Sequence, residues 1–370
     1  MNVKSHNILF NLSENISGQL IPITTAIAIF MLVSGCAGSG AVVKIAEPKV
    51  DTSVQSVWPA PPEQARIRYL GSLKTRKPGG DTQKLSVSDI LLGKKQQGSE
   101  TVLTSPYGVH SNSKGKVFVT DTGNTGLVVF DLKQNSVAYW GKSGPGFLQK
   151  ALGVTSDAQG NVYVSDIFDK RIVVFDKDGN YRNAFGGKDI LSTPSGLAFN
   201  NSTQQLYVVD AKKNQVLVFN KQGKLEFTIG EQGNEPGKFS FPTNISLNAE
   251  NSLLFVADSM NFRVQVFKAD GTFINTFGVN GNRPGDFSRL KGIGLDTQGH
   301  VYAVDAAFNN FQVLDQQGQL LLAVGRASVK ADGFYLPTGL HVDRNNKIFI
   351  ADQYNQRIQM FEYIGAADNP

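Results

Sequence analysis

The amino-acid sequence predicts an all-β protein built from six copies of one four-stranded unit. A short apolar run that ends in aspartate, such as FVTD or YVSD, recurs six times, with 44 to 48 residues between successive aspartates. These runs are rich in β-branched and aromatic residues, which is typical of strands. Glycines separate the runs at roughly ten-residue intervals, as tight turns between short strands require. Six four-stranded units in succession predict a six-bladed β-propeller.

Each unit is expected to contain its four strands in a fixed order. The inner strand opens with a Pro/Gly pair, as in PYGVHS and PTGLHV, and the second strand ends in the recurring aspartate. A tight Gly-containing turn separates the third strand from the fourth, which ends in an apolar residue followed by Gly. The third strands are expected to begin at Leu127, Ile172, Val216, Val264, Phe311 and Ile358.

The two ends of the repeat region predict how the ring closes. The sixth unit stops at EYIG after its third strand, so it lacks an outer strand. The segment RIRYLG, residues 66–71, has the pattern of a fourth strand but precedes the first unit. We therefore expect this N-terminal strand to complete the last blade and to cover its exposed edge.

Six aspartates and three arginines recur at fixed places in the units. The aspartates are Asp121, Asp166, Asp210, Asp258, Asp305 and Asp352, and the arginines are Arg171, Arg263 and Arg357. A carboxylate that occurs once per unit at a strand end is best explained as a hydrogen-bond acceptor that caps the turn into the third strand. The arginines are expected to pair nearby. Acid/base catalysis or metal binding by the aspartates is the alternative interpretation.

These motifs resemble the NHL-repeat family of six-bladed propellers. The matching pattern is a Pro/Gly opening, a YVxD strand, a DxxNxR turn and a VF strand. It is complete in two units, in Asp258, Asn261 and Arg263 and in Asp352, Asn355 and Arg357. The resemblance spans residues 101–364 and implies the fold. It implies little about chemistry, because one fold supports many unrelated functions.

Two histidines provide the candidate for chemistry in the channel. His110 and His341 occupy the same place in the inner strands of the first and sixth units, which become neighbours when the ring closes. Neighbouring imidazoles can bind a metal, and peptidylglycine lyases, which share the NHL fold, line their channel with three zinc-binding histidines. No third histidine matches the position here. We therefore expect no catalytic residue, metal or cofactor, with a channel-metal lyase or hydrolase as the alternative.

Glycine-rich connections between successive units are the expected interaction surface, because loops on a rigid scaffold commonly bind partners. They carry mixed charge beside aromatic residues, a composition typical of protein interfaces. The candidate interaction residues are Lys142, Phe147, Lys238, Phe239, Arg283, Asp286, Phe287 and Arg289. The alternative is that the phenylalanines point inward and fill the space between neighbouring blades.

The N-terminal segment predicts export and lipid anchoring. An uncharged apolar run, residues 20–33, has the length of a signal-peptide core and is followed by VSGC. This string resembles a bacterial lipobox and ends at Cys36, the only cysteine, which excludes disulfides and paired-thiolate metal sites. The resemblance implies cleavage after residue 35, lipid on Cys36 and, from Ala37, an outer-membrane address. We expect a signal peptide over 1–35, a flexible tether over 36–65, a closing strand and basic connector over 66–100, and the propeller over 101–370.

The distribution of charge argues against nucleic acid as a partner. The chain carries a net charge of +5. Residues 1–35 carry no net charge, residues 36–65 carry −1, residues 66–100 carry +5 and residues 101–370 carry only +1. A nucleic-acid-binding domain usually concentrates positive charge on its folded face. We therefore expect a membrane-anchored module that binds or scaffolds envelope proteins. A structural envelope protein whose basic segment engages anionic surface polymers is a further alternative.

Overall fold

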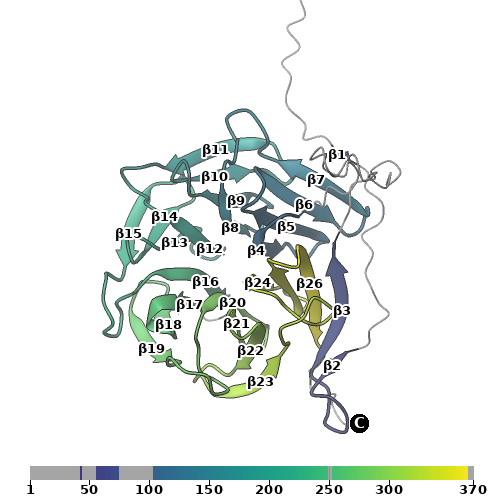
Figure 1. Ribbon diagram of the computed structural model, residues 1–370. Coiled ribbons are helices and arrows are strands. Elements are labelled where there is room, and N and C mark those ends of the chain that lie inside the picture. The colour runs from purple at the N-terminus through teal and green to yellow at the C-terminus, as the bar shows by residue number, and fades with distance from the viewer. Residues whose placement is uncertain (1–41, 44–55, 75–102, 249, 251, 366–370) are drawn as a thin grey trace, which may run out of the picture. The chain divides into compact units, whose positions relative to one another are not determined.

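A computed structural model describes residues 42–43, 56–74, 103–248, 250 and 252–365. It confirms the six-bladed propeller: six antiparallel sheets are arranged around a centre, with the inner strand of each sheet nearest the middle (Figure 1). Within this part of the chain the only helical element is the 3-10 turn η1, Ser259–Asn261. None of the described residues forms a helix long and apolar enough to cross a membrane.

The four strands of each blade follow the order predicted from the sequence. The inner strands are β4 (Pro106–Ser111), β8 (Ala151–Ser156), β12 (Pro194–Asn200), β16 (Pro242–Asn248), β20 (Leu290–Leu295) and β24 (Pro337–Val342). The second strands are β5 (Lys116–Asp121), β9 (Val162–Asp166), β13 (Gln205–Asp210), β17 (Leu253–Asp258), β21 (Val301–Asp305) and β25 (Lys347–Asp352). The third strands are β6 (Leu127–Asp131), β10 (Arg171–Phe175), β14 (Gln215–Asn220), β18 (Arg263–Lys268), β22 (Asn310–Leu314) and β26 (Arg357–Tyr363). The outer strands of the first five blades are β7 (Ser136–Trp140), β11 (Tyr181–Gly186), β15 (Leu225–Ile229), β19 (Phe273–Phe277) and β23 (Leu320–Val324).

Strand β3 (Ile67–Leu73) closes the ring as the outer strand of the sixth blade. It pairs antiparallel with β26, in a register that places Ile67 opposite Tyr363 and Leu73 opposite Ile358. The pairing joins the two ends of the repeat region, as predicted, and covers the edge that β26 would otherwise expose (Figure 1).

The end of the segment expected to be a tether belongs to the folded blade, which corrects the boundary drawn at residue 65. Strand β2 (Val57–Trp58) pairs with β3, and the Trp58 ring packs edge-on against Phe361 at 5.7 Å between centroids. The two-residue strand β1 (Val42–Val43) pairs with β7. Residues 1–35, Cys36 and the connector over 75–100 lie outside the described residues.

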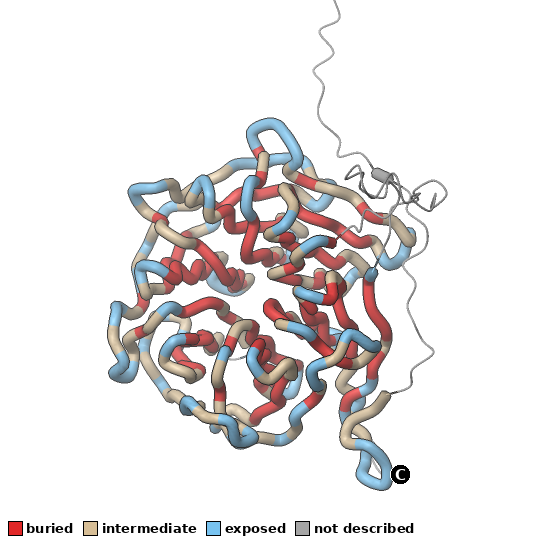
Figure 2. The backbone as a smooth tube through the Cα atoms, in the orientation of Figure 1, coloured by how far each residue is buried: buried red, intermediate tan, exposed pale blue. Residues whose placement is uncertain are grey.

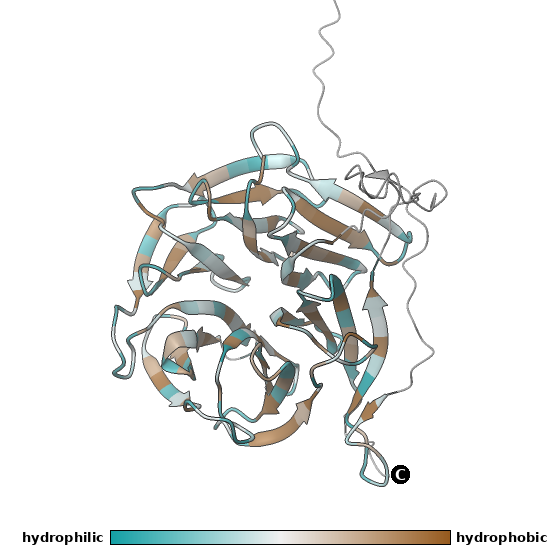
Figure 3. Ribbon diagram, viewed as in Figure 1, coloured by the Kyte–Doolittle hydropathy of each residue, from teal (hydrophilic) through white to brown (hydrophobic). Residues whose placement is uncertain are grey.

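The apolar core lies between blades rather than at a single centre. Each of six clusters combines side chains from two neighbouring blades, so every blade is held by both of its neighbours. Leu73 of the closing strand packs in the cluster between the sixth and first blades, and Ile67 in the one between the fifth and sixth. The first three strands of the blades are mostly buried, whereas the turns and much of the outer strands are intermediate or exposed (Figure 2). Apolar residues are concentrated along strands such as β6 and β10 (Figure 3).

Glycines allow the inner strands to approach one another closely at the hub. A Cβ atom on Gly153 would lie 1.9 Å from the carbonyl oxygen of Ser195 in the next blade, and one on Gly339 would lie 2.4 Å from the carbonyl oxygen of Tyr107. Both distances are shorter than any real contact. The third residue of the inner strand is therefore glycine in five blades, and the fourth blade departs from this pattern with Asn244.

We predict that the closing strand contributes a large share of the stability. Deletion of residues 37–73 removes β3 and the buried side chains Ile67, Tyr69 and Leu73, each worth about 1.5–3 kcal/mol. Deletion of residues 37–55 leaves β2 and β3 in place. The longer deletion is expected to lower the melting temperature far more than the shorter one in thermal unfolding followed by circular dichroism. Equal melting temperatures would contradict the closure.

Candidate functional site

The six recurring aspartates are fully buried and hold the loops that join the blades. Each carboxylate accepts backbone N–H groups from the residues just before the inner strand of its own blade. Asp121, for example, accepts from Thr104 at 2.6 Å and Ser105 at 2.9 Å. The corresponding backbone donors in the other blades are Gln149, Lys150, Ser192, Thr193, Ser240, Ser288, Arg289 and Tyr335. The carboxylates of the first, second, third and fifth blades also accept backbone N–H groups from the turn that follows the second strand. In the fourth and sixth blades the side-chain amides of Asn261 and Asn355 donate from this turn instead.

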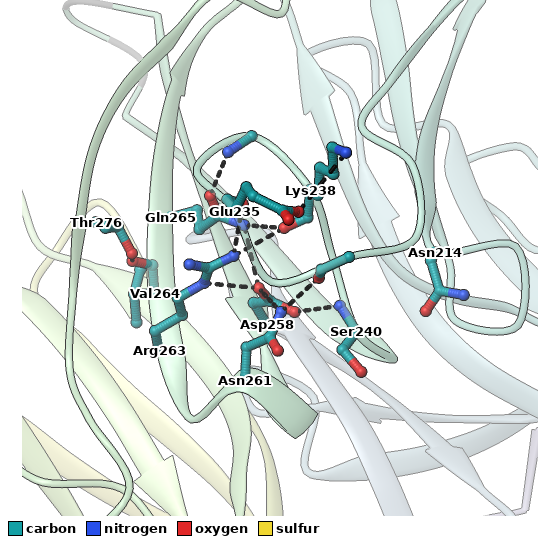
Figure 4. Close-up of polar contacts among 12 residues, drawn as sticks. Asn214, Glu235, Lys238, Ser240, Asp258, Asn261, Arg263, Val264, Gln265 and Thr276 are labelled. Carbon is teal, nitrogen blue, oxygen red and sulfur yellow. Dashed lines mark hydrogen bonds and ion pairs between the residues drawn. The ribbon is translucent and has the colours of Figure 1, made fainter.

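Arginine extends this network to the inter-blade loops in the two blades that carry the complete motif, and Figure 4 shows the fourth blade. Asp258 accepts from Arg263 Nε at 2.9 Å and from the Asn261 amide at 2.8 Å. The guanidinium also donates to the carbonyl oxygens of Glu235 and Lys238, at 3.0 and 2.9 Å. Burial raises the pKa of Asp258, and the hydrogen bonds from Asn261, Ser240 and Arg263 oppose that rise. Arg357 repeats these contacts with Asp352 and with loop carbonyls.

Arg171 follows a different pattern. Its guanidinium pairs with Asp169 at 3.1 Å and donates to the carbonyl oxygen of Phe147 at 2.8 Å, and it makes no bond to Asp166. The buried Nε atom has no partner among the described residues. The loop attachment is thus preserved in the second blade without the buried ion pair.

The inter-blade loops hold their apolar residues inward, which corrects the assignment of two phenylalanines to the interaction surface. Phe239 and Phe287 are completely buried between blades. A Cβ on Gly230, which has φ +80°, would lie 2.4 Å from the Phe239 ring, so the glycine that ends each fourth strand makes room for this side chain. The same place is filled by Phe334 and, in the first loop, by Leu148 rather than by the half-buried Phe147.

The charged loop residues singled out from the sequence lie at or near the surface. Lys142, Arg283 and Arg289 are exposed, and Lys238 and Asp286 are partly exposed. Lys238 pairs with Glu231 at 3.2 Å and Glu235 at 3.6 Å, and the Asp286 carboxylate accepts the backbone N–H of Arg283 at 3.0 Å.

Exposed apolar side chains gather on one side of the ring, which the sequence did not reveal. We call this side the aspartate face; it comprises the turns between second and third strands and the inter-blade loops, which the aspartates join. Seven of the twelve large exposed apolar side chains in the described part of the chain belong to it: Phe168, Phe241, Met260, Val279, Val329, Tyr335 and Tyr354. Phe168, Met260 and Tyr354 are 61%, 61% and 67% exposed. Tyr354 packs beside Tyr335, with ring centroids 4.8 Å apart.

These three exposed residues share one place in the repeat. Each is the second residue after the recurring aspartate, where the other blades have Gly123, Lys212 and Ala307. The opposite side of the ring carries only Leu132 and Ile364 from the same set of twelve, in the turns after third strands, and the remaining three lie on outer strands. The aspartate face therefore carries most of the large exposed apolar side chains of the described residues.

The hub brings His110 and His341 together at the seam between the first and sixth blades. Their ring centroids lie 4.3 Å apart, as expected for neighbouring blades. His110 Nε2 shares a hydrogen bond with the hydroxyl of Ser156 at 2.8 Å, and His341 Nε2 donates to the carbonyl oxygen of Ser111 at 3.1 Å. Burial lowers the pKa of both residues, that of His341 to about 4, and His341 lowers that of His110 further.

The donor set of this pair does not fit the three-histidine metal site that the family resemblance implies. Both Nε2 atoms are engaged with neighbouring protein groups. Across the described residues there is no cluster of three or more His, Cys, Asp or Glu side chains suited to a metal ion. The geometry instead makes the histidines neutral polar groups of the seam.

Comparisons with known proteins agree with the architecture. A family model described as a 6-bladed beta-propeller matches residues 191–261 and 247–320. No curated protein matches the chain. Among solved structures, a streptogramin B lyase has 13% sequence identity and a TM-score of 0.54, and the match covers 70% of this chain and 93% of that chain.

Two further structures broaden the range of functions found on this architecture. A catalytically inactive virginiamycin B lyase from Staphylococcus aureus with quinupristin has 17% identity and a TM-score of 0.52, over 70% of this chain and 96% of that one. An auxiliary nutrient binding protein from Bacteroides thetaiotaomicron has 12% identity and a TM-score of 0.56, over 71% and 70%. At these identities the likeness establishes the fold alone.

We predict that loss of one buried carboxylate is costly. Asp258→Ala leaves the mostly buried Arg263 without its partner, so the free energy of unfolding is expected to fall by about 3–5 kcal/mol in urea denaturation. Asp169→Ala removes a carboxylate that is 39% exposed and pairs with Arg171, and should cost less than about 1 kcal/mol. Similar losses of unfolding free energy in the two variants would show that the buried Asp258 network contributes no more to stability than the exposed ion pair.

The histidine pair predicts a loss of stability in acid. Because the folded-state pKa of each imidazole lies below its ordinary value of 6.5, the unfolded chain takes up these protons first as the pH falls. The stabilisation is complete above pH 6.5 and is lost towards pH 4, with His341 alone accounting for about 3 kcal/mol. Replacing both residues by Asn should flatten this dependence in melting curves recorded from pH 7 to 4.5.

His300 provides the control for that experiment. Its Nδ1 atom lies 2.8 Å from the Asp296 carboxylate, and this hydrogen bond raises its pKa. Its contribution is therefore present below pH 6.5 and is lost as the pH rises through the raised value. His300→Asn should leave the acid loss in place, and an equal flattening in this variant would argue against the seam as its source.

Proposed function

We propose that the protein is a lipid-anchored, extracytoplasmic propeller that binds a partner protein of the bacterial envelope through its aspartate face. One observation carries the proposal: most of the large exposed apolar side chains of the described residues lie on this face. Contiguous exposed apolar surface commonly marks an interaction site, and aromatic residues dominate binding energy at interfaces.

The rigidity of the face supports the same role. The loops and turns that carry Phe168, Met260 and Tyr354 are held by buried carboxylates and, in three blades, by arginines that donate to loop carbonyls. A surface that is already ordered loses little conformational entropy on binding. This favours recognition of a folded partner by a preformed platform.

The anchoring part of the proposal depends on the N-terminal sequence. The apolar run over residues 20–33 precedes the only cysteine, Cys36, at the distance a lipoprotein signal requires. Two or three acyl chains on this residue would give stable attachment, whereas one chain gives only marginal attachment. Ala37 supports an outer-membrane location. The segment between Cys36 and β2 would then separate the ring from the lipid surface.

The interaction is tested by removing the exposed apolar groups. The triple variant Phe168→Ser, Met260→Ser and Tyr354→Ser should melt close to the wild-type temperature, because all three side chains are mostly exposed. It should lose most of the proteins that co-purify with the wild type after cross-linking in membranes, measured by quantitative mass spectrometry. The matched control carries Tyr181→Ser, Ile274→Ser and Leu321→Ser on outer strands.

The control variant should keep the same partners in the same amounts. If the triple variant on the aspartate face also keeps them, this surface is not the interface. In that case the basic segment over residues 66–95 becomes the alternative, with anionic surface polymers as its expected partner.

We predict that Cys36→Ser prevents anchoring. Because Cys36 is the only cysteine in the chain, the variant should incorporate no labelled palmitate and should remain uncut before residue 36. Labelling in growing cells followed by immunoprecipitation measures both. Label that persists in the variant would exclude the proposed anchor.

A further inference from the structure

The hub of the propeller is basic on one side and contains no acidic side chain in the positions that surround it. The second residues of the inner strands are Tyr107, Leu152, Ser195, Thr243, Lys291 and Thr338, and the fifth residues are His110, Thr155, Ala198, Ser246, Gly294 and His341. The residues just before these strands, at the rim of the aspartate face, are Ser105, Lys150, Thr193, Phe241, Arg289 and Leu336. These three tiers contain three permanent cations and no carboxylate.

Two of these cations lie two residues apart at the start of one strand. Lys291 is partly buried in β20, and Arg289 lies two residues before it at the exposed rim. Burial lowers the pKa of Lys291, and the positive charge of Arg289 lowers it further. Neither side chain makes a hydrogen bond or ion pair with any other described residue. Uncompensated like charges in a partly desolvated place are costly unless a counter-charge is supplied.

Tyr107 is the second residue of β4, the place in the first blade that Lys291 occupies in the fifth. Burial raises the pKa of its hydroxyl, and the positive charge of Arg289 opposes that rise. The phenol keeps its proton at neutral pH and is available as a donor, since its hydroxyl has no partner among the described residues. Blades one and five thus contribute one neutral and two charged donors to the same end of the hub.

The corresponding residues of other blades show what a purely structural side chain does at this place. Thr243 donates its hydroxyl to the carbonyl oxygen of Lys291 at 3.0 Å, and Thr338 donates to that of Tyr107 at 2.9 Å. Each threonine connects its inner strand to the next one. In the first blade Thr120 makes the equivalent connection, to the carbonyl oxygen of Leu152 at 2.6 Å, so the Tyr107 side chain is not needed for it. Lys291 makes no such connection within the described part of the chain.

We propose that Lys291, Arg289 and Tyr107 form a binding site for a small oxyanion, a molecule bearing a carboxylate or phosphate group, at the end of the hub nearest the aspartate face. Arg289 and Lys291 provide the charge that such a group requires, and charge-assisted hydrogen bonds to it are stronger than neutral ones. The nearby rim residue Phe241, 46% exposed, offers an apolar contact for the rest of the molecule. The site needs no protein partner, so it goes beyond the proposed function and does not depend on it.

The test is calorimetric titration of the full chain in detergent with citrate and, separately, with inorganic phosphate, at an ionic strength kept constant with sodium chloride. We expect saturable binding of at least one of the two, and their relative affinities distinguish a carboxylate ligand from a phosphate ligand. Lys291→Met should weaken this binding at least tenfold. Lys212→Met, which removes an exposed lysine from a turn of the same face, should leave it unchanged.

Two further measurements keep the proposal testable if Lys291→Met does not fold. Tyr107→Phe removes only a hydroxyl and should weaken binding several-fold. Reductive ¹³C-methylation of the wild type followed by NMR should show one lysine resonance whose pKa rises when the anion binds. The resonance is assigned to Lys291 by its absence from the Lys291→Met or the Lys291→Arg variant. Absence of saturable binding, or equal weakening by Lys212→Met, would overturn the proposal. Retention of anion binding by the triple apolar variant would show that the two proposals stand separately.

Discussion

A buried carboxylate at the end of each second strand is the interaction on which the rest of this propeller depends. It is completely removed from solvent in all six blades, a position that is unfavourable for a charge unless donors surround it. The donors are mainly backbone N–H groups of the loop entering the blade, so the same group fixes where the inner strand begins and how one blade follows the next. In two blades Arg263 and Arg357 add a counter-charge and extend the attachment to the carbonyl oxygens of the preceding loop.

This repeated scaffold separates structural residues from those free to serve a function. Loop residues that recur, such as Phe239 and Phe287, fill the gaps between blades. Residues that differ from blade to blade make no contact that the fold requires. Phe168 and Tyr354 are exposed on the aspartate face, and Lys291 stands where Thr243 and Thr338 hydrogen-bond to the next inner strand. Both the proposed protein interface and the proposed oxyanion site consist of such residues, presented on loops and strands that the carboxylates hold in place.

The sequence predicted the number of blades, the strand order and the closure by an N-terminal strand, because these follow from spacing and from the period of apolar residues. It did not predict the direction of side chains within loops. A phenylalanine after Pro-Gly can point outward or inward, and only the missing Cβ of Gly230, which makes room for the Phe239 ring, decides the matter. The exposure of Met260 could not be predicted either, because an apolar residue just after a strand is indistinguishable in sequence from a buried residue that continues the strand. The tether boundary was misplaced because β2 is only two residues long and precedes a proline-rich turn.

Amide hydrogen exchange tests most directly whether buried carboxylates order the aspartate face. The inter-blade loop over residues 230–241 contains no long strand, yet the backbone N–H of Ser240 is bonded to Asp258 at 2.7 Å, and Gly237 donates to the Gln265 side chain at 2.9 Å. These two amides are expected to exchange nearly as slowly as those of β17, and far more slowly than the N–H group of Lys221 in the turn on the opposite side of the ring. Exchange of Ser240 and Gly237 at the rate of that turn would contradict the account.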